Sequence, residues 1–96
     1  MHSLSRKQAL KVTQERRQRR KEAGLWLREL RERRGLSQRE LAEAVGVEVY
    51  TVISQLESGR GLISLSQDRQ LLWADALQVE PREFARRLAS YYDPRT

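Results

Sequence analysis

The sequence predicts an all-α chain, and three observations support that fold class. Apolar residues recur three and four positions apart, as they do on one face of a helix, and no stretch alternates like a half-buried strand. Only two prolines and five glycines interrupt the 96 residues. Because a chain of this length closes a single modest core, we expect one compact domain of about five helices.

The first core helix is predicted from an apolar stripe at positions i, i+3, i+4 and i+7. Its members are Ala23, Trp26, Leu27 and Leu30. Gly35 is expected to end this helix, because glycine readily takes the positive φ that is common just past a helix end.

Two helices of about nine residues each are predicted next, joined by a short turn. The first begins at a capping box, in which Ser37 and Glu40 satisfy each other's exposed backbone amides, and ends at Gly46. It carries Leu41, Ala42 and Val45. The second, which closes near Gly59, has the apolar residues Val49, Val52, Ile53 and Leu56. This spacing suits a helix-turn-helix at 37–57, and a plain helical hairpin satisfies it too.

The last two helices follow a loop predicted at 60–65. Ser66 is expected to cap the fourth helix, which ends near Gln78, and Pro81 suits the first turn of the fifth. The apolar residues of the fourth helix are Leu72, Trp73, Ala76 and Leu77. Those of the fifth are Phe84, Leu88, Tyr91 and Tyr92, before a tail at 93–96. The two tyrosines suit either a dimer interface or packing on their own domain.

Positive charge is concentrated near the N-terminus. Residues 1–36 hold twelve Lys or Arg against four Glu, whereas 37–96 are slightly acidic. We interpret 1–21 as a basic extension that precedes the domain at 22–92. With Ser5 and Gln8 as a cap it forms a helix running into the first core helix, or it is disordered when alone. Gly24 weakens a continuous helix by about 1 kcal/mol relative to Ala.

Composition excludes several classes of function. The chain has no cysteine and a single histidine, His2, so we expect no disulfide, metal site or cofactor. No nucleophile, base and orienting group can be assembled, and we therefore expect no enzyme. No apolar run approaches the roughly 20 residues that span a bilayer, and no cleavable signal pattern is present. These features predict a cytoplasmic protein.

Three segments resemble the Cro/phage-repressor (Xre-like) helix-turn-helix family. They are Gly35–Ala42, Val45–Val47 and Ile53–Arg60, and the similarity extends from about Leu25 to Phe84. The resemblance implies a lambda-repressor-like domain that binds double-stranded DNA, in a nucleoid-associated protein of prokaryotic or phage type. There is one departure: six residues separate Gly46 from Ile53, where family members commonly have five, so the turn is expected to be longer near Glu48.

The resemblance also implies roles for individual residues. Base edges in the major groove are contacted by Thr51 and Gln55, and by Tyr50 unless that residue contacts a phosphate instead. Gln38 holds a phosphate, and Arg31 pairs with Glu57 to hold the reading helix in place. Further phosphate-positioning candidates are Arg39, Ser54, Arg60 and the basic residues Arg16, Arg17, Arg19, Arg20 and Lys21. Arg39 is equally compatible with a solvent-exposed position.

The function predicted from these residues is sequence-specific regulation of transcription. We expect a homodimer on an inverted-repeat operator, acting as a repressor. The alternative is an antitoxin or another protein-interaction module with autoregulatory DNA binding, whose basic tail or aromatic C-terminus neutralises a protein partner. The tail would then become ordered only on binding. The basic segment suits a DNA backbone or minor groove, an RNA, or an acidic protein surface.

Overall fold

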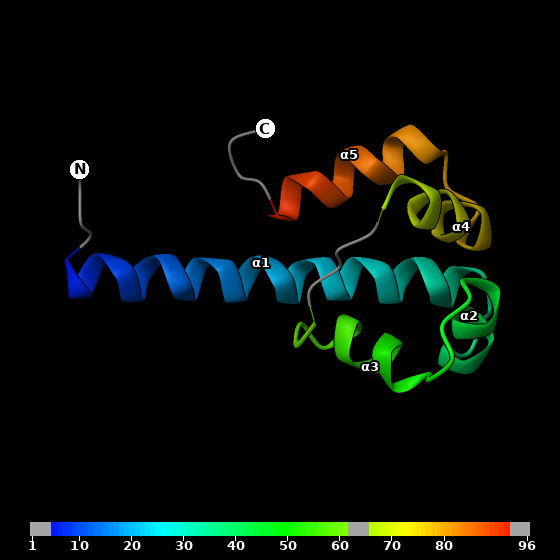
Figure 1. Ribbon diagram of the computed structural model, residues 1–96, viewed down its shortest axis with the longest axis horizontal. Coiled ribbons are helices and arrows are strands. Elements are labelled where there is room, and N and C mark those ends of the chain that lie inside the picture. Colours follow the sequence, from blue (N-terminus) through cyan, green and yellow to red (C-terminus); the bar gives the residue numbers. More distant parts are fainter. Residues whose placement is uncertain (1–4, 62–65, 93–96) are drawn as a thin grey trace.

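The computed structural model describes residues 5–61 and 66–92, and this part of the chain forms five α-helices and no strand. The helices are α1 (Arg6–Arg33), α2 (Gln38–Ala44), α3 (Thr51–Glu57), α4 (Gln67–Leu77) and α5 (Pro81–Tyr92). Figure 1 shows α1 as a long rod, with α3 along one side and α5 along the other. The predicted all-α fold is confirmed.

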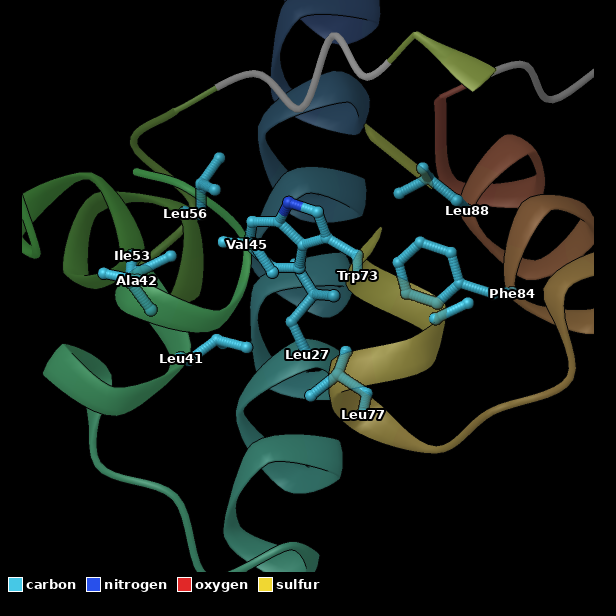
Figure 2. Close-up of a cluster of buried hydrophobic side chains, with 11 residues drawn as sticks. Leu27, Leu41, Ala42, Val45, Ile53, Leu56, Trp73, Leu77, Phe84 and Leu88 are labelled. Atoms are coloured by element: carbon cyan, nitrogen blue, oxygen red, sulfur yellow. The ribbon is translucent and has the colours of Figure 1, made fainter. Parts of the chain in front are cut away.

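The core lies where the C-terminal half of α1 meets the other four helices. Its buried members are Leu27, Leu41, Ala42, Val45, Ile53, Leu56, Trp73, Ala74, Leu77, Phe84 and Leu88. Figure 2 shows Trp73 near the centre of this cluster, with Phe84 and Leu88 of α5 to one side. Trp26 of α1 is half-buried and stacks on Phe84 with ring centroids 5.3 Å apart. One cluster therefore connects all five helices.

The basic extension is helical and continuous with the first core helix. The α1 helix begins at the predicted capping box, where the Ser5 hydroxyl accepts a hydrogen bond from the Gln8 amide and the Gln8 side chain accepts one from the Ser5 amide. It then runs without interruption through Gly24. Of the two alternatives left open by the sequence, the structure has the continuous helix.

Gly24 lies at a close crossing of α1 and α3. A Cβ atom at this position would lie 2.4 Å from the carbonyl oxygen of Glu57 and 2.5 Å from that of Leu56. Both distances are far below van der Waals contact, and the obstructing atoms belong to backbone. A residue that weakens an isolated helix is therefore required here by the helix that packs against it.

Some details of the predicted apolar stripes are wrong. The α2 and α3 helices have seven residues each, not nine, and α3 begins only at Thr51. The long turn delays the start of α3, so Val49 precedes the helix and is 55% exposed, while Val52 is 39% exposed. In α4 the buried side is shifted by one position, so that Ala74 is fully buried and Leu72 is 49% exposed.

The fifth helix packs on its own domain through Tyr91. The Tyr91 ring lies 5.6 Å from that of Trp26, and its hydroxyl accepts a hydrogen bond from Arg87 Nε. This contact is the own-domain packing left open as one alternative for Tyr91. The side chain of Tyr92, residues 62–65 of the predicted loop and the tail at 93–96 lie outside the described residues.

We predict that Gly24→Ala destabilises the domain by about 1–3 kcal/mol, because overpacking against the end of α3 exceeds the roughly 1 kcal/mol gained in helix propensity. Urea unfolding followed by circular dichroism measures the change. The reciprocal control is Ala89→Gly at an exposed position of α5, where the same pair of residues should show the ordinary preference for Ala. A Gly24→Ala variant as stable as the parent chain would contradict the tight crossing.

Candidate nucleic-acid interface

The turn between α2 and α3 begins at a tightly closed helix end. Gly46 has φ 73°, and its amide donates to the carbonyl of Glu43. The next amide, that of Val47, donates to the carbonyl of Ala42 over 2.8 Å. This pair of bonds is the Schellman arrangement, which needs a left-handed residue at its centre. Glycine at position 46 therefore reverses the chain and brings α3 against α2.

The α3 helix has one buried side and one outward side. Ile53 and Leu56 are buried in the core, while Thr51 and Gln55 are exposed one helical turn apart. The side chains of Thr51 and Gln55 form no hydrogen bond with any residue in the described part of the chain. Their hydroxyl and amide groups thus remain available to a molecule outside the fold. Ser54 is exposed as well.

Arg39 and Tyr50 form a contact across the outer surface of the turn. The guanidinium carbon of Arg39 lies 4.6 Å from the centroid of the Tyr50 ring, within the range of a cation–π interaction. This contact joins the first turn of α2 to the residue before α3. It orders both side chains beside the outward side of α3. Arg39 is exposed and at the same time in contact with this ring, so both alternatives for it, a phosphate contact and solvent, stay open.

The end of α3 is fixed by Glu57, whose side chain is only 5% exposed. Arg31 of α1 donates to it twice, from Nε over 2.7 Å and from Nη2 over 2.9 Å. Gln38 Nε2 adds a third bond of 3.1 Å, and Arg31 Nη1 donates to the carbonyl of Leu36. The hydrogen bond to Glu57 raises the pKa of Arg31. The charge of Glu57 is thus balanced inside the domain.

The α2 helix starts at the predicted capping box. The Ser37 amide donates to Glu40 Oε1 over 2.9 Å, and the Glu40 amide donates to the Ser37 hydroxyl over 3.0 Å. The bond from the Ser37 backbone, followed by the hydroxyl, lowers the pKa of Glu40. A lowered carboxyl pKa stabilises the fold above the ordinary value and loses that effect as pH falls through the lowered one. The cap is therefore retained at neutral pH.

The basic segment of α1 ends beside the C-terminal end of α3. A Cβ atom on Gly59 would lie 2.9 Å from the Cα of Lys21, so the two backbones are in direct contact. Arg60, which follows Gly59, is exposed. Arg19 forms an ion pair of 3.8 Å with Glu15, whereas Arg16, Arg17 and Arg20 form none with any residue of the described ranges. The extension thus brings unpaired cations next to the outward helix.

The helix-turn-helix family matches residues 27–84, which is more than half of the chain. The chain belongs to the Cro/C1-type (Xre-like) helix-turn-helix family. The resemblance noted in the sequence is therefore confirmed, and the matched domain implies DNA binding. No curated protein matches this chain.

Within 5–61 and 66–92, no group of three or more potential metal ligands comes together. In the same ranges no helix is both long and apolar enough to cross a membrane.

Three contacts at this interface were not predicted from the sequence. The Arg39–Tyr50 stack and the bond from Gln38 to Glu57 each join residues that only the folded turn brings together. The approach of Lys21 to Gly59 depends on the crossing of two helices. One signal did exist, because Gly24 inside an otherwise helix-forming stretch indicates a close approach of another backbone.

We predict that Arg31→Met lowers the free energy of unfolding by about 3 kcal/mol, because it leaves the buried Glu57 carboxylate without its cation. The matched control is Arg28→Met in the same helix. Arg28 pairs with Glu32 over 2.6 Å, but the two side chains are 58% and 54% exposed, so this loss should stay below about 1 kcal/mol. Chemical unfolding of both variants measures the two losses in the free energy of unfolding. Equal losses would show that Arg31 has no special structural role.

Proposed function

We propose that this chain regulates transcription by binding duplex DNA in a sequence-dependent way, with α3 in the major groove. The proposal depends on one observation: α3 has a buried side and an opposite, exposed side. Ile53 and Leu56 hold it on the core, while Thr51 and Gln55 present unbonded polar groups on the opposite side. A helix held in this way can present its outward groups to base edges without rearranging the fold.

Thr51 and Gln55 are the base-reading residues in this proposal. The amide of Gln55 donates one hydrogen bond and accepts another, which matches the N7 and N6 positions of adenine. The Thr51 methyl group suits contact with the methyl group of thymine. Tyr50, at the start of α3 and 39% exposed, contacts the neighbouring base pair or its phosphate. The stack with Arg39 limits the positions that its ring can take.

The phosphate-positioning residues surround the outward side of α3. Gln38 keeps a carbonyl oxygen and one N–H free after its bond to Glu57, and that N–H suits a phosphate oxygen. Arg39, Ser54 and Arg60 are all exposed near the same helix. Such contacts fix the register of the protein on the duplex and carry little sequence information. We assign these four residues to register and the α3 residues to specificity.

We further propose a homodimer on an inverted repeat, acting as a repressor. A helix of seven residues is about 10 Å long, which corresponds to about three base pairs. One copy therefore reads too little sequence to select a site, and a second copy doubles the recognised length. Two-fold symmetry would place the half-sites about 34 Å apart, one turn of the duplex. A regulator that occupies such a site at a promoter blocks access to it.

One observation favours a second candidate, a protein-interaction module such as an antitoxin that also binds DNA. Leu71 and Leu72 of α4 are adjacent, and they are 54% and 49% exposed. Neighbouring exposed leucines suit a protein contact better than a phosphate. Co-purification of a stoichiometric second protein with the tagged chain would support this candidate, and its loss on Leu71→Ser would locate the contact.

We predict that Gln55→Ala loses about 1–3 kcal/mol of preference at one base position and binds scrambled duplex as the parent chain does. The duplex is obtained first by selecting bound sequences from a random pool with the full chain. Titrations of that duplex and of a scrambled version then measure the preference. The control is Arg60→Ala, which should weaken binding to both duplexes alike. Equal weakening by Gln55→Ala would remove Gln55 from the reading residues.

A further inference from the structure

We propose that the N-terminal half of α1 is a second DNA-binding element, which contacts the duplex beyond the base pairs read by α3. One side of the helix, formed by Arg17, Arg20 and Lys21 and called here the arm face, contacts the phosphate backbone of that flanking DNA. The proposal rests on the proposed function of α3. It concerns residues that lie before the family match, which begins at residue 27.

The arm face has a fixed position relative to α3. Lys21 lies against Gly59 through backbone atoms, and Gly24 lies against the carbonyls of Leu56 and Glu57. These contacts fix the arm face next to the C-terminal end of the reading helix, where Arg60 is also exposed. DNA bound at α3 therefore brings its phosphates close to these cations.

The cations of the arm face occupy one side of α1. Arg17, Arg20 and Lys21 are spaced i, i+3 and i+4, so they share the side that Lys21 turns toward Gly59. Arg19 and Lys11 lie on other sides of the helix, since Arg19 is two positions, or about 200°, from both Arg17 and Lys21. Arg19, which the sequence offered as a phosphate-positioning candidate, forms an ion pair with Glu15 and is not part of the arm face in this proposal. The arm-face arginines, in contrast, form no ion pair with a described residue.

A long part of α1 projects past α3. Figure 1 shows the first half of α1 extending beyond the end of α3 and α5. Residues 6–21 of this helix span about 22 Å at 1.5 Å per residue, which equals about seven base pairs of duplex. That stretch holds eight Lys or Arg and one acidic residue, Glu15. Its reach and charge suit one further stretch of phosphate backbone.

DNA suits the arm face better than other polyanions do. An RNA or an acidic protein would satisfy the charge alone, but neither explains why the cations adjoin the end of a DNA-reading helix. Because α1 is already helical and the glycine crossing fixes its position, little conformational freedom is lost on binding. The flanking segment of the same duplex is the polyanion nearest to the arm face.

The experiment compares two duplexes and three forms of the full chain. One duplex contains only the base pairs recovered from the random pool, and the other adds about eight base pairs of fixed unrelated sequence at each end, to cover the roughly seven that the arm spans. The forms are the parent chain, Arg17→Gln with Arg20→Gln, and the control Lys11→Gln with Arg19→Gln, which removes the same charge from other sides of the helix. Affinity is measured from 50 to 200 mM salt.

We expect the flanks to raise the affinity of the parent chain at least tenfold near 0.1 M salt, since each phosphate contact contributes a factor of about eight there. The Arg17→Gln, Arg20→Gln form should lose this gain, and its salt slope on the flanked duplex should fall by about 2. The control form should keep most of the gain. Circular dichroism should show that all three forms are equally helical.

Four outcomes would overturn the inference. The flanks could bring no gain, the arm-face variant could keep the gain, or the control could lose as much as the arm-face variant, which would indicate bulk charge. An unrelated RNA hairpin that competes as well as the flanked duplex would assign the arm face to RNA. Sequence-dependent binding of the short duplex would leave the proposed function standing in each case, whereas failure to bind either duplex would end both proposals.

Discussion

The contact between α1 and the end of α3 is the constraint on which the rest of this structure depends. Two atomic features act together at this contact. Gly24 lets the helices approach until backbone meets backbone, and Arg31 then binds Glu57 at two points. The first sets the distance between the helices and the second sets the rotation of α3. The direction in which Gln55 is presented follows from both.

A helix as short as α3 needs this support, because seven residues do not form a stable helix in water. The stability of α3 comes from burying Ile53 and Leu56 in a core that α1, α4 and α5 complete. Function and stability therefore share one set of side chains. A substitution far from the outward side, in Trp73 for example, affects DNA binding through the population of folded domain.

The distribution of charge has a structural cause and a consequence for binding. Glu57 lies within α3, yet its carboxylate is almost fully buried and bound by Arg31 and Gln38. The outward side of α3 consequently carries no acidic group to repel phosphate. Beside it, Arg17 and Arg20 are not held by any acid of the described ranges. The molecule thus presents hydrogen-bonding groups on α3 and cations alongside.

The sequence by itself determined the number of helices and most of their ends, with the start of α3 as the exception, because caps, glycines and apolar spacing act over a few residues; Ser37, Gly46 and the stripe of α1 are examples. It also determined the family, through residues in a fixed order. Tertiary structure decided what depends on distant partners. The exposure of Val49 followed from a longer turn, and the requirement for glycine at position 24 followed from α3 lying against it. Local rules treat that glycine as a weakness of α1, since the backbone that needs the space is more than thirty residues away in the chain.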